Sequence, residues 1–391
     1  MFKETSKELL DFLSKSPTAF HAVENYRQIL NADGFKELLE SEHWDIVPGG
    51  KYYVTRNNTS ILAFKVGTKL DNYSFNIVTS HTDSPTFKVK ENAEIEVKNK
   101  YTQLNTEGYG GMLCATWLDR PLSIAGRVLV SEGNSIVTKL LNIDRDLLMI
   151  PNVAIHMNRA ANDGFKYNLQ VDMLPLLSAG DDRQKDFKQI IADELGVKKE
   201  DILGHDLYLY NRMAPSIWGA NEEFISAGHL DDLQCGFASL KALLSGYNDE
   251  SIDIMACFDN EEVGSGTKQG ADSTLLRDTL TRINNALGKT EEDYHRALAS
   301  SFMLSADNAH ALHPNYTDKT DPTNHPVLNR GIVIKFNANQ KYCTDAVSAA
   351  LFKELCTKAG VPYQTFVNRS DIAGGSTLGN ISNTQVPMNT V

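Results

Sequence analysis

The sequence has no long hydrophobic run. A transmembrane helix needs roughly eighteen or more consecutive apolar residues, and no stretch of the 391 residues comes near that length. The amino terminus also lacks the unbroken apolar core of a signal peptide, because residues 1–26 carry a charge every few positions, a pattern typical of an amphipathic helix. We therefore expect a cytoplasmic protein.

Cysteine is scarce and unpaired in the sequence. The chain has an odd number of widely scattered cysteines with no CxxC pair, namely Cys114, Cys235, Cys257, Cys343 and Cys356. This pattern argues against a disulfide framework and against a thiolate zinc site. Most of the five are better explained as inert thiols of the core.

Positive charge is in the minority. The 38 Lys and Arg residues face 50 Asp and Glu residues, which gives a formal charge of −12, and no dense Lys/Arg tract interrupts the acidic balance. Nucleic acid and anionic membranes are therefore poor partners for this chain. The sequence also lacks internal repeats and low-complexity segments, and its 41% hydrophobic content is typical of a globular protein.

The length and the order of elements predict an α/β protein with an insertion. A chain of this size exceeds one ordinary compact core. Residues 1–86 begin with two helices, interrupted at Ser16-Pro17, and continue with apolar strands at 60–66 and 73–80. From about residue 223 helices and strands alternate, as they do around a mostly parallel sheet.

The middle of the chain has a different pattern. Residues 87–97 alternate apolar and charged side chains, as half-exposed antiparallel strands do. The further elements that we expect here are strands at 122–130, 136–141 and 153–157 and a helix near 184–195. We therefore predict an inserted β-rich domain at 87–222, between two segments of one α/β domain at 1–86 and 223–391.

The chain is organised around residues 251–266. An apolar strand at 252–258 runs into Asp259, Asn260, Glu261 and Glu262 and then a glycine turn. The carboxyl ends of strands are where ligands bind in open α/β sheets. Two neighbouring carboxylates that are both buried require a compensating positive charge, either a metal ion or a proton.

Three other places show the same arrangement. Acids or histidines stand at the ends of predicted strands or at strand-to-helix turns, and the pairs are His81 with Asp83, Asp231 with Asp232, and Asp307 with His310. We expect all of them at the same edge of one sheet. Imidazole and carboxylate donors without thiolate suit Zn²⁺, Mn²⁺ or Co²⁺, and a shared carboxylate would give a two-metal site.

Each residue also has an ordinary interpretation. His81 alone could be a hydrogen-bonded core histidine, although Asp83 can reach back to its ring as the partners of metal-bound histidines do. Asp232 is expected mainly as an N-cap of the following helix, and Asp307 could cap a turn. The shared sheet edge favours the metal interpretation for the set as a whole.

Two other chemistries fit the sequence poorly. Gly264, Gly266 and Gly270 are spaced one residue too widely for GxGxxG, and there is no Walker GK[ST] motif. Ser376 in GGSTLG lacks the GxSxG context of a hydrolase nucleophile. Neither phosphate-loop nor serine-hydrolase chemistry is therefore expected.

Nearly the whole chain carries long motifs, namely SHTDSP, YGGMLCATWLDRPLSIAGRV, FISAGHLDDLQCG, FDNEEVGSG, SADNAHALHPNY and NRSDIAGGSTLGNIS. These motifs resemble those of the aspartyl aminopeptidase family of zinc metallopeptidases. The resemblance implies a three-layer catalytic α/β domain of the zinc exopeptidase type, interrupted by a β-rich dimerisation domain, with dimers assembling into a dodecamer. It also implies a dinuclear zinc aminopeptidase that releases an amino-terminal residue, Asp or Glu, from peptides.

The same resemblance assigns roles to single residues. The positions that match metal ligands are His81, Asp231, Glu262 and Asp307, with Asp231 bridging two Zn²⁺ ions. Glu261 matches the general base. Asp83 is grouped with the catalytic residues because it can reach back to the His81 ring. His156 matches a histidine that a neighbouring subunit contributes to the active site, and His310 and Lys335 match residues near the substrate.

One family feature is missing from the sequence. Members carry a further zinc-binding histidine in a Met-His-Ser motif shortly after the glycine-rich segment, whereas this sequence stops at Val391. Either the recorded sequence is truncated at this point or one metal ion is held by fewer protein ligands, and we expect truncation. A form that lacks the histidine is expected to bind one metal ion weakly and to have low activity.

Two other functions remain open from the sequence. One is a related dinuclear dipeptidase or deacylase, and the other is an inactive assembly protein that keeps the fold without a full metal site.

Overall fold

The computed structural model describes residues 2–180 and 186–391, and these form two compact units. Within the described residues, unit 1 comprises residues 2–22, 84–180, 186–216 and 225–228, and unit 2 comprises residues 23–83, 217–224 and 229–391. The domain boundaries predicted from the sequence, at residues 86 and 222, stay a prediction. Within the described residues, no helix has the length and apolar character needed to cross a membrane.

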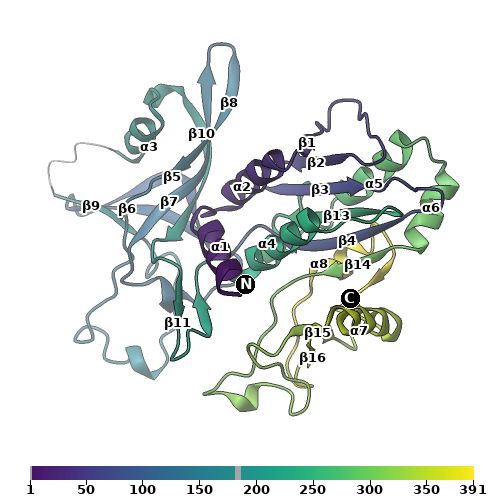
Figure 1. Cartoon of the computed structure of the whole chain (residues 1–391). Coiled ribbons are helices and arrows are strands. Elements are labelled where there is room, and N and C mark those ends of the chain that lie inside the picture. Colours follow the sequence, from purple (N-terminus) through teal and green to yellow (C-terminus); the bar gives the residue numbers. More distant parts are fainter. Residues whose placement is uncertain (1, 181–185) are drawn as a thin grey trace. The chain divides into compact units, whose positions relative to one another are not determined.

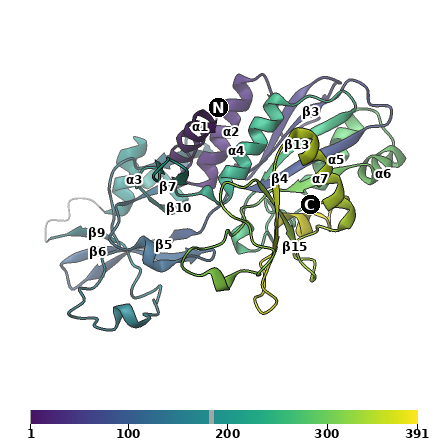
Figure 2. The same ribbon diagram turned by 60° about the horizontal axis from the view of Figure 1, so that its bottom comes forward.

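Unit 2 is built on a seven-stranded sheet with the order β1-β2-β3-β13-β4-β14-β17. Its strands are β1 (Lys36–Glu37), β2 (Lys51–Arg56), β3 (Ser60–Val66), β4 (Ser74–His81), β13 (Ser251–Phe258), β14 (Phe302–Ser305) and β17 (Asn389–Thr390). β13, β4 and β14 are parallel neighbours, whereas β3 pairs antiparallel with both β2 and β13. β13 and β4 run side by side in both views (Figure 1, Figure 2).

Helices cover both faces of this sheet, which gives the three-layer α/β fold expected from the sequence. Alternate residues of β13 point to opposite faces. Ile254 and Phe258 belong to one core cluster with residues from α5 (Leu275–Ala286), α6 (Glu291–Ala299) and α8 (Leu378–Ser382). α4 (Leu230–Ser245) packs against β4 and β13, and Tyr53 Oη donates a hydrogen bond to Asn31 of α2 (Ala19–Ala32).

Two small sheets complete unit 2. β15 (Ile332–Phe336) and β16 (Tyr363–Val367) form a parallel pair that is separate from the main sheet, with α7 (Ala346–Ala359) between them in the chain. β12 (Phe224–Ser226) pairs with β11 (Ser216–Trp218). The short strand that follows the β-rich segment thus pairs outside the main sheet.

Unit 1 contains a six-stranded antiparallel sheet with the order β8-β7-β10-β5-β6-β9, which confirms the β-rich character expected for the insertion. Its strands are β5 (Thr86–Val97), β6 (Tyr101–Tyr109), β7 (Leu122–Glu132), β8 (Ser135–Asn142), β9 (Leu176–Ala179) and β10 (Ile202–Asn211). Alternate residues of the strands, such as Ile124 and Val128 of β7, enter one apolar core with Phe187 and Ile191 of α3 (Phe187–Leu195). α1 (Phe2–Ser14) also belongs to this unit.

Two predicted elements of the middle segment do not match the structure fully. One has a different structure, and the other begins outside the described residues. Residues 153–157 form an exposed turn and not a strand, because Val153, Ile155 and Met157 all face solvent and have no partner strand within the described residues. The predicted helix at 184–195 matches α3 from Phe187 onward, and residues 184 and 185 lie outside the described residues.

Candidate metal centre

The candidate centre lies at the carboxyl ends of the parallel strands of unit 2. Phe258 of β13 is in register with His81 of β4, and Ser305 of β14 is in register with Thr79. Because the three strands are parallel, the segments that follow them emerge at one edge of the sheet. The histidine and the acids that follow β4, β13 and β14 are therefore brought together by topology.

His81 occupies the middle of the cluster. It is 1% exposed, its Nδ1 lies 3.0 Å from the main-chain carbonyl oxygen of Asp83, and its Nε2 lies 3.5 Å from Asp231 Oδ1. Burial by itself lowers the pKa of His81, but the contacts with Asp231 and Asp83 outweigh burial and raise that pKa well above its ordinary value. Since Nδ1 is engaged by Asp83, Nε2 is the nitrogen that faces the cluster.

Asp83 contacts both His81 and the main chain of the two glutamates. Its Oδ1 lies 3.3 Å from His81 Nδ1, and its two carboxylate oxygens accept hydrogen bonds from the main-chain N–H groups of Glu261 and Glu262, each at 3.1 Å. The carboxylate is buried. Asp83 therefore fixes both the orientation of the imidazole and the position of the two glutamates.

Glu261 and Glu262 begin a short 3-10 turn directly after β13. Burial raises the pKa of Glu261 to about 7, with His81 opposing the shift and the charges of Asp307 and Asp83 adding to it. Burial likewise raises the pKa of Glu262 to about 8. Both carboxyl groups thus lie where their negative charge is poorly compensated.

Asp231 and Asp232 begin α4 but have opposite environments. The side chain of Asp231 is 58% exposed, and although burial raises its pKa, the contact with His81 outweighs this and lowers it. Asp232 is fully buried, and this burial raises its pKa well above the ordinary value. The peptide bond between the two residues is cis.

Asp232 is not the N-cap that we expected from the sequence. The N-cap position of α4 is His229, and Asp232 Oδ2 instead accepts a hydrogen bond of 3.1 Å from the main-chain N–H of His81. The helix start is thereby tied to the end of β4. The sequence could not show this, because the two partners are 151 residues apart.

Asp307 enters the cluster from the end of β14 and is paired with Lys335 of β15. Lys335 Nζ lies 2.7 Å from Asp307 Oδ1 and donates a second hydrogen bond, of 2.8 Å, to the carbonyl oxygen of Asn308. Asn308 Nδ2 in turn donates to the carbonyl oxygen of Leu230. The loop after β14 is therefore fixed against the start of α4.

The ligand atoms form two groups that could each hold a cation. One group is His81, Asp231 and Asp307, the other is His81, Glu261 and Glu262, and the ligand atoms within each group lie within 4.8 Å of one another. Neither group contains a thiolate. Imidazole with carboxylate suits zinc and related divalent metals, and a dication would relieve the mutual repulsion that the raised pKa values of the glutamates report. The donor set thus fits a metal centre.

The candidate substrate residues are placed differently from one another. Lys335 contacts Asp307 directly, whereas His310 lies in the wall of a cavity of about 530 Å³ in unit 2. The cavity is also lined by Lys319, Tyr342 and Arg369. His156 belongs to unit 1, where it is exposed in the turn at 155–157.

Sequence reasoning missed one further acid in this part of unit 2. Asp259, the last residue before the turn, is buried, and burial together with the charge of Asp83 raises its pKa to about 7. Its Oδ1 accepts the main-chain N–H of Asn260 at 2.8 Å. The sequence signal was present, since Asp259 lies close to Glu261 and Glu262 in the same motif. Only the structure shows that Asp259 is the most buried of the three acids.

Comparisons with known proteins agree with this geometry. Residues 12–391 match the family of aminopeptidase I zinc metalloproteases (M18). A probable M18 family aminopeptidase 2 of Clostridium novyi is 49% identical over 392 residues, covering 99% of this chain and 90% of the relative.

Two solved structures share the fold. The structure of the Ape4 and Nbr1 complex matches with a TM-score of 0.95 and 36% identity, covering 99% of this chain and 79% of the other. The S. cerevisiae mApe1 dodecamer matches with a TM-score of 0.86 and 29% identity, covering 100% of this chain and 89% of the other. Family, relatives and fold agree over the whole length, and the chain belongs to the M18 family of zinc metallo-aminopeptidases.

Proposed function

We propose that this aminopeptidase is dinuclear and releases an amino-terminal Asp or Glu from peptides, with Glu261 as the general base. The observation that carries the proposal is the convergence of one imidazole and several carboxylates at the edge where β4, β13 and β14 end. The donor count is larger than one zinc ion uses.

The ligands divide most simply around Asp231. His81 has one nitrogen facing the cluster and can bind one ion, whereas a carboxylate has two oxygens and can bridge two. We assign His81, Asp231 and Asp307 to one ion, and Asp231 with Glu262 to the other. Lys335, which pairs with Asp307, supplies part of the neutralising charge.

Glu261 is the group best suited to move the proton. Zinc ions bound here would supply the positive charge that acidifies a water molecule and polarises the scissile carbonyl. Glu261 is 15% exposed, with Oε2 4.0 Å from His81 Nε2, so its carboxylate borders the cluster. It would accept the proton of the attacking water and return it to the leaving amine, while Asp83 holds its main chain in place.

The preference for an acidic terminal residue is supported by the charge near the cluster. The cavity that contains His310 also has Lys319 and Arg369 in its wall, although Arg369 is paired with Asp371. Tyr342, which lines the same cavity, lies 5.6 Å from Lys335 Nζ. A carboxylate side chain of a substrate would therefore meet cationic groups there.

We further propose a homo-oligomer of dodecameric size in the cytoplasm, in which His156 completes the site of a neighbouring subunit. The matched mApe1 structure is a dodecamer, and His156 is exposed on unit 1 as such a contribution requires. All five cysteines are free thiols, which suits the reducing cytoplasm.

The direct test is hydrolysis of peptides that differ only in their first residue. Peptides beginning with Asp or Glu should be cleaved faster than the matched Leu peptide, and a chelator should abolish cleavage until zinc is restored. Cleavage of acylated amino acids in place of free peptides would favour a deacylase, and metal-independent inactivity on every substrate would favour an assembly protein.

The role of His156 has its own test. Subunits carrying His156→Ala and subunits carrying Glu261→Gln should each be inactive alone and should recover part of the activity when mixed. Proven subunit exchange without recovery would leave His156 with no part in a neighbour's site.

A further inference from the structure

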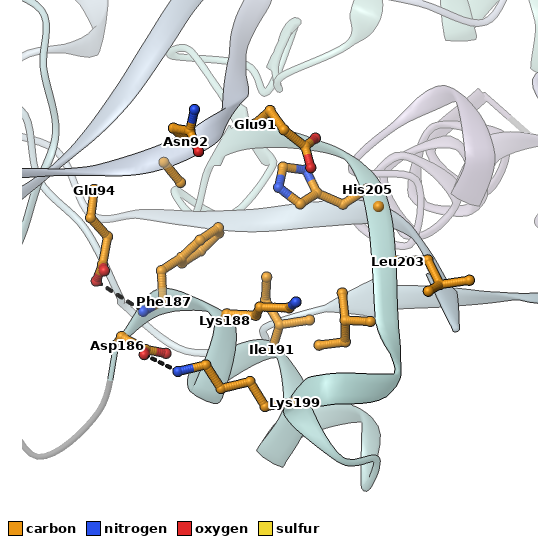
Figure 3. A pocket seen from close by; sticks show the side chains of 13 residues that line it. Glu91, Asn92, Glu94, Asp186, Phe187, Lys188, Ile191, Lys199, Leu203 and His205 are labelled. Carbon is orange, nitrogen blue, oxygen red and sulfur yellow. Dashed lines mark hydrogen bonds and ion pairs between the residues drawn. The ribbon is translucent and has the colours of Figure 1, made fainter. Parts of the chain in front are cut away.

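A cavity of about 490 Å³ lies in unit 1, where two strands of the sheet diverge (Figure 3). β5 and β10 are neighbours but pair only at Tyr208 and Lys88. The pairing of β5 with β6 changes register between Val89 and Glu94. The pairing of β10 with β7 changes register between Ile202 and Gly204. Such bulges re-aim side chains and often occur beside functional sites.

The floor of the cavity is apolar. Phe187 and Ile191 of α3 and Ile202 of β10 are buried side chains that line it, and Leu203, at the bulge, is exposed beside them. The Phe187 ring meets the His205 ring edge-on, with 6.3 Å between the ring centroids. An aliphatic group entering the cavity would therefore bury its apolar surface against these side chains.

Some polar groups around the cavity are already engaged. Glu94 Oε1 accepts the main-chain N–H of Phe187 at 3.0 Å, and Asp186 accepts the N–H of Gln189 and pairs with Lys199. These contacts hold the start of α3 against β5. They are explained by the fold and need no ligand.

Three other groups are not engaged by the fold. His205 Nδ1 is buried without a hydrogen-bond partner, and the exposed side chains of Glu91 and Lys188 have no hydrogen bond or ion pair within the part of the chain that the structure describes. A buried polar atom without a partner costs about 1–3 kcal/mol. Figure 3 shows the Glu91 carboxylate turned toward the His205 ring and Lys188 on the opposite, α3 side.

We propose that this cavity binds a small zwitterion with an apolar side chain, namely a free α-amino acid or a dipeptide. Glu91 would bind the ammonium group, Lys188 the carboxylate, and His205 Nδ1 would complete a hydrogen bond. The side chain would rest on Phe187 and Ile191. The volume is within the ordinary range of small-molecule pockets.

Other ligand classes fit the lining less well. A phosphate would face the carboxylates of Glu91 and Glu94. A metal ion would lack three converging donors, since both groups of candidate ligands in the described residues belong to unit 2. Amino acids are also the product class of the proposed reaction, so the cavity would allow product to be sensed outside the catalytic cluster. The binding itself does not depend on the proposed specificity.

The test is calorimetric titration of the full chain with L-leucine after zinc has been removed with a chelator, which keeps the catalytic metals from binding the amino acid. Saturable binding is expected. N-acetyl-leucine lacks the ammonium group, leucinamide lacks the carboxylate and glycine lacks the side chain, so each should bind at least ~10-fold more weakly. Leucyl-leucine in the same titration distinguishes a dipeptide from a free amino acid.

Variants place the binding in this cavity. A Cβ at Gly204 would meet no atom within 4 Å, so Gly204→Val fills the cavity without a backbone clash and should abolish binding. Gly111→Val is the matched control, because a Cβ there also meets open space and Gly111 does not line the cavity. Glu91→Gln and Lys188→Gln should each weaken binding ~10-fold.

Three results would overturn the proposal. They are no saturable leucine binding, equal binding of leucine and N-acetyl-leucine, and unchanged leucine binding in Gly204→Val. If circular dichroism shows that Gly204→Val does not fold, the exposed substitutions Glu91→Gln and Lys188→Gln decide, and unchanged binding in both contradicts the proposal.

Discussion

Both units contain partly buried carboxylates, but only one of them compensates the charge. In unit 1, Asp206 is held by Lys88 Nζ and Arg127 Nε, each at 2.9 Å. Burial alone would raise its pKa, but the two cations outweigh burial and lower it. In unit 2, burial raises the pKa of Glu261 to about 7 and that of Glu262 to about 8.

The difference separates structural acids from functional ones. A carboxylate that meets its cations within the chain contributes to the stability of the fold and has no need of a ligand. The acids at the edge of the unit 2 sheet meet His81 and Lys335, which are too few for the carboxylates gathered there. That remaining negative charge is what a divalent cation would neutralise.

The largest expected effect is on turnover in unit 2. Glu261→Gln keeps the shape of the side chain but cannot accept a proton from water, so the rate of hydrolysis should fall by ~10²–10⁴-fold. Bound metal, measured by elemental analysis, should stay near the wild-type value. Glu200→Gln, an exposed acid of unit 1, is the matched control and should leave the rate unchanged.

The two units should also respond to pH in opposite directions. In the metal-free protein the folded state keeps protons on Glu261 up to about pH 7, whereas its ordinary pKa is 4.5. The protonated Glu261 therefore stabilises the folded state fully below about pH 4.5. This contribution to the free energy of unfolding, roughly 3 kcal/mol, is lost as pH rises through 7. Asp206, whose pKa is lowered, stabilises the protein at neutral pH and loses this effect as pH falls.

Urea unfolding of chelator-treated protein from pH 4.5 to 8 measures the effect of Glu261, since Asp206 acts only below its ordinary pKa of 3.8. The decline in stability toward pH 8 should become smaller in Glu261→Gln, and added zinc should reverse it. A metal-free protein whose stability rises steadily from pH 4.5 to 8 would mean that the glutamates are not poorly compensated.

Asp232 tests whether a buried acid can act through its neighbours. Asp232→Ala removes the acceptor of the His81 main-chain N–H and should weaken zinc binding by about 10–100-fold. Asp232→Asn keeps an oxygen acceptor and should retain most of the affinity. Equal zinc affinity in wild type and Asp232→Ala, measured by competition with a chromophoric chelator, would make this residue a packing residue only.

The smallest effect is expected from the compensated acid. Asp206→Ala leaves Lys88 and Arg127 without their common partner and should destabilise the fold by about 2 kcal/mol. Thermal unfolding measures that loss. Zinc content and activity per folded molecule should remain unchanged, and a loss of bound zinc would contradict the separation between the two kinds of acid.

Much of the fold could be predicted from the sequence because its signals are local. The apolar strands at 60–66 and 252–258 and the break between α1 and α2 match the structure closely. The segment at 153–157 misled us, since its apolar residues are exposed in a turn. The pairing of β12 with β11 outside the main sheet could not be predicted either, because strand partners are not encoded in a three-residue pattern.

The candidate site was predicted in its residue types but not in its supports. His81, Glu261 and Asp307 could be predicted because each is a polar residue at or just after the end of an apolar strand, a pattern that is visible in the sequence. The hydrogen bonds of Asp83 to the glutamate main chain, and of Asp232 to His81, join residues more than a hundred positions apart. No local pattern encodes such contacts.

The most direct test of the dinuclear centre is a calorimetric zinc titration of chelator-treated protein and two variants. We predict two sites of unequal affinity in the wild type, with Asp231→Asn weakening both and Asp307→Asn weakening only one. A single site in the wild type, or two sites that are unaffected by Asp231→Asn, would contradict the account.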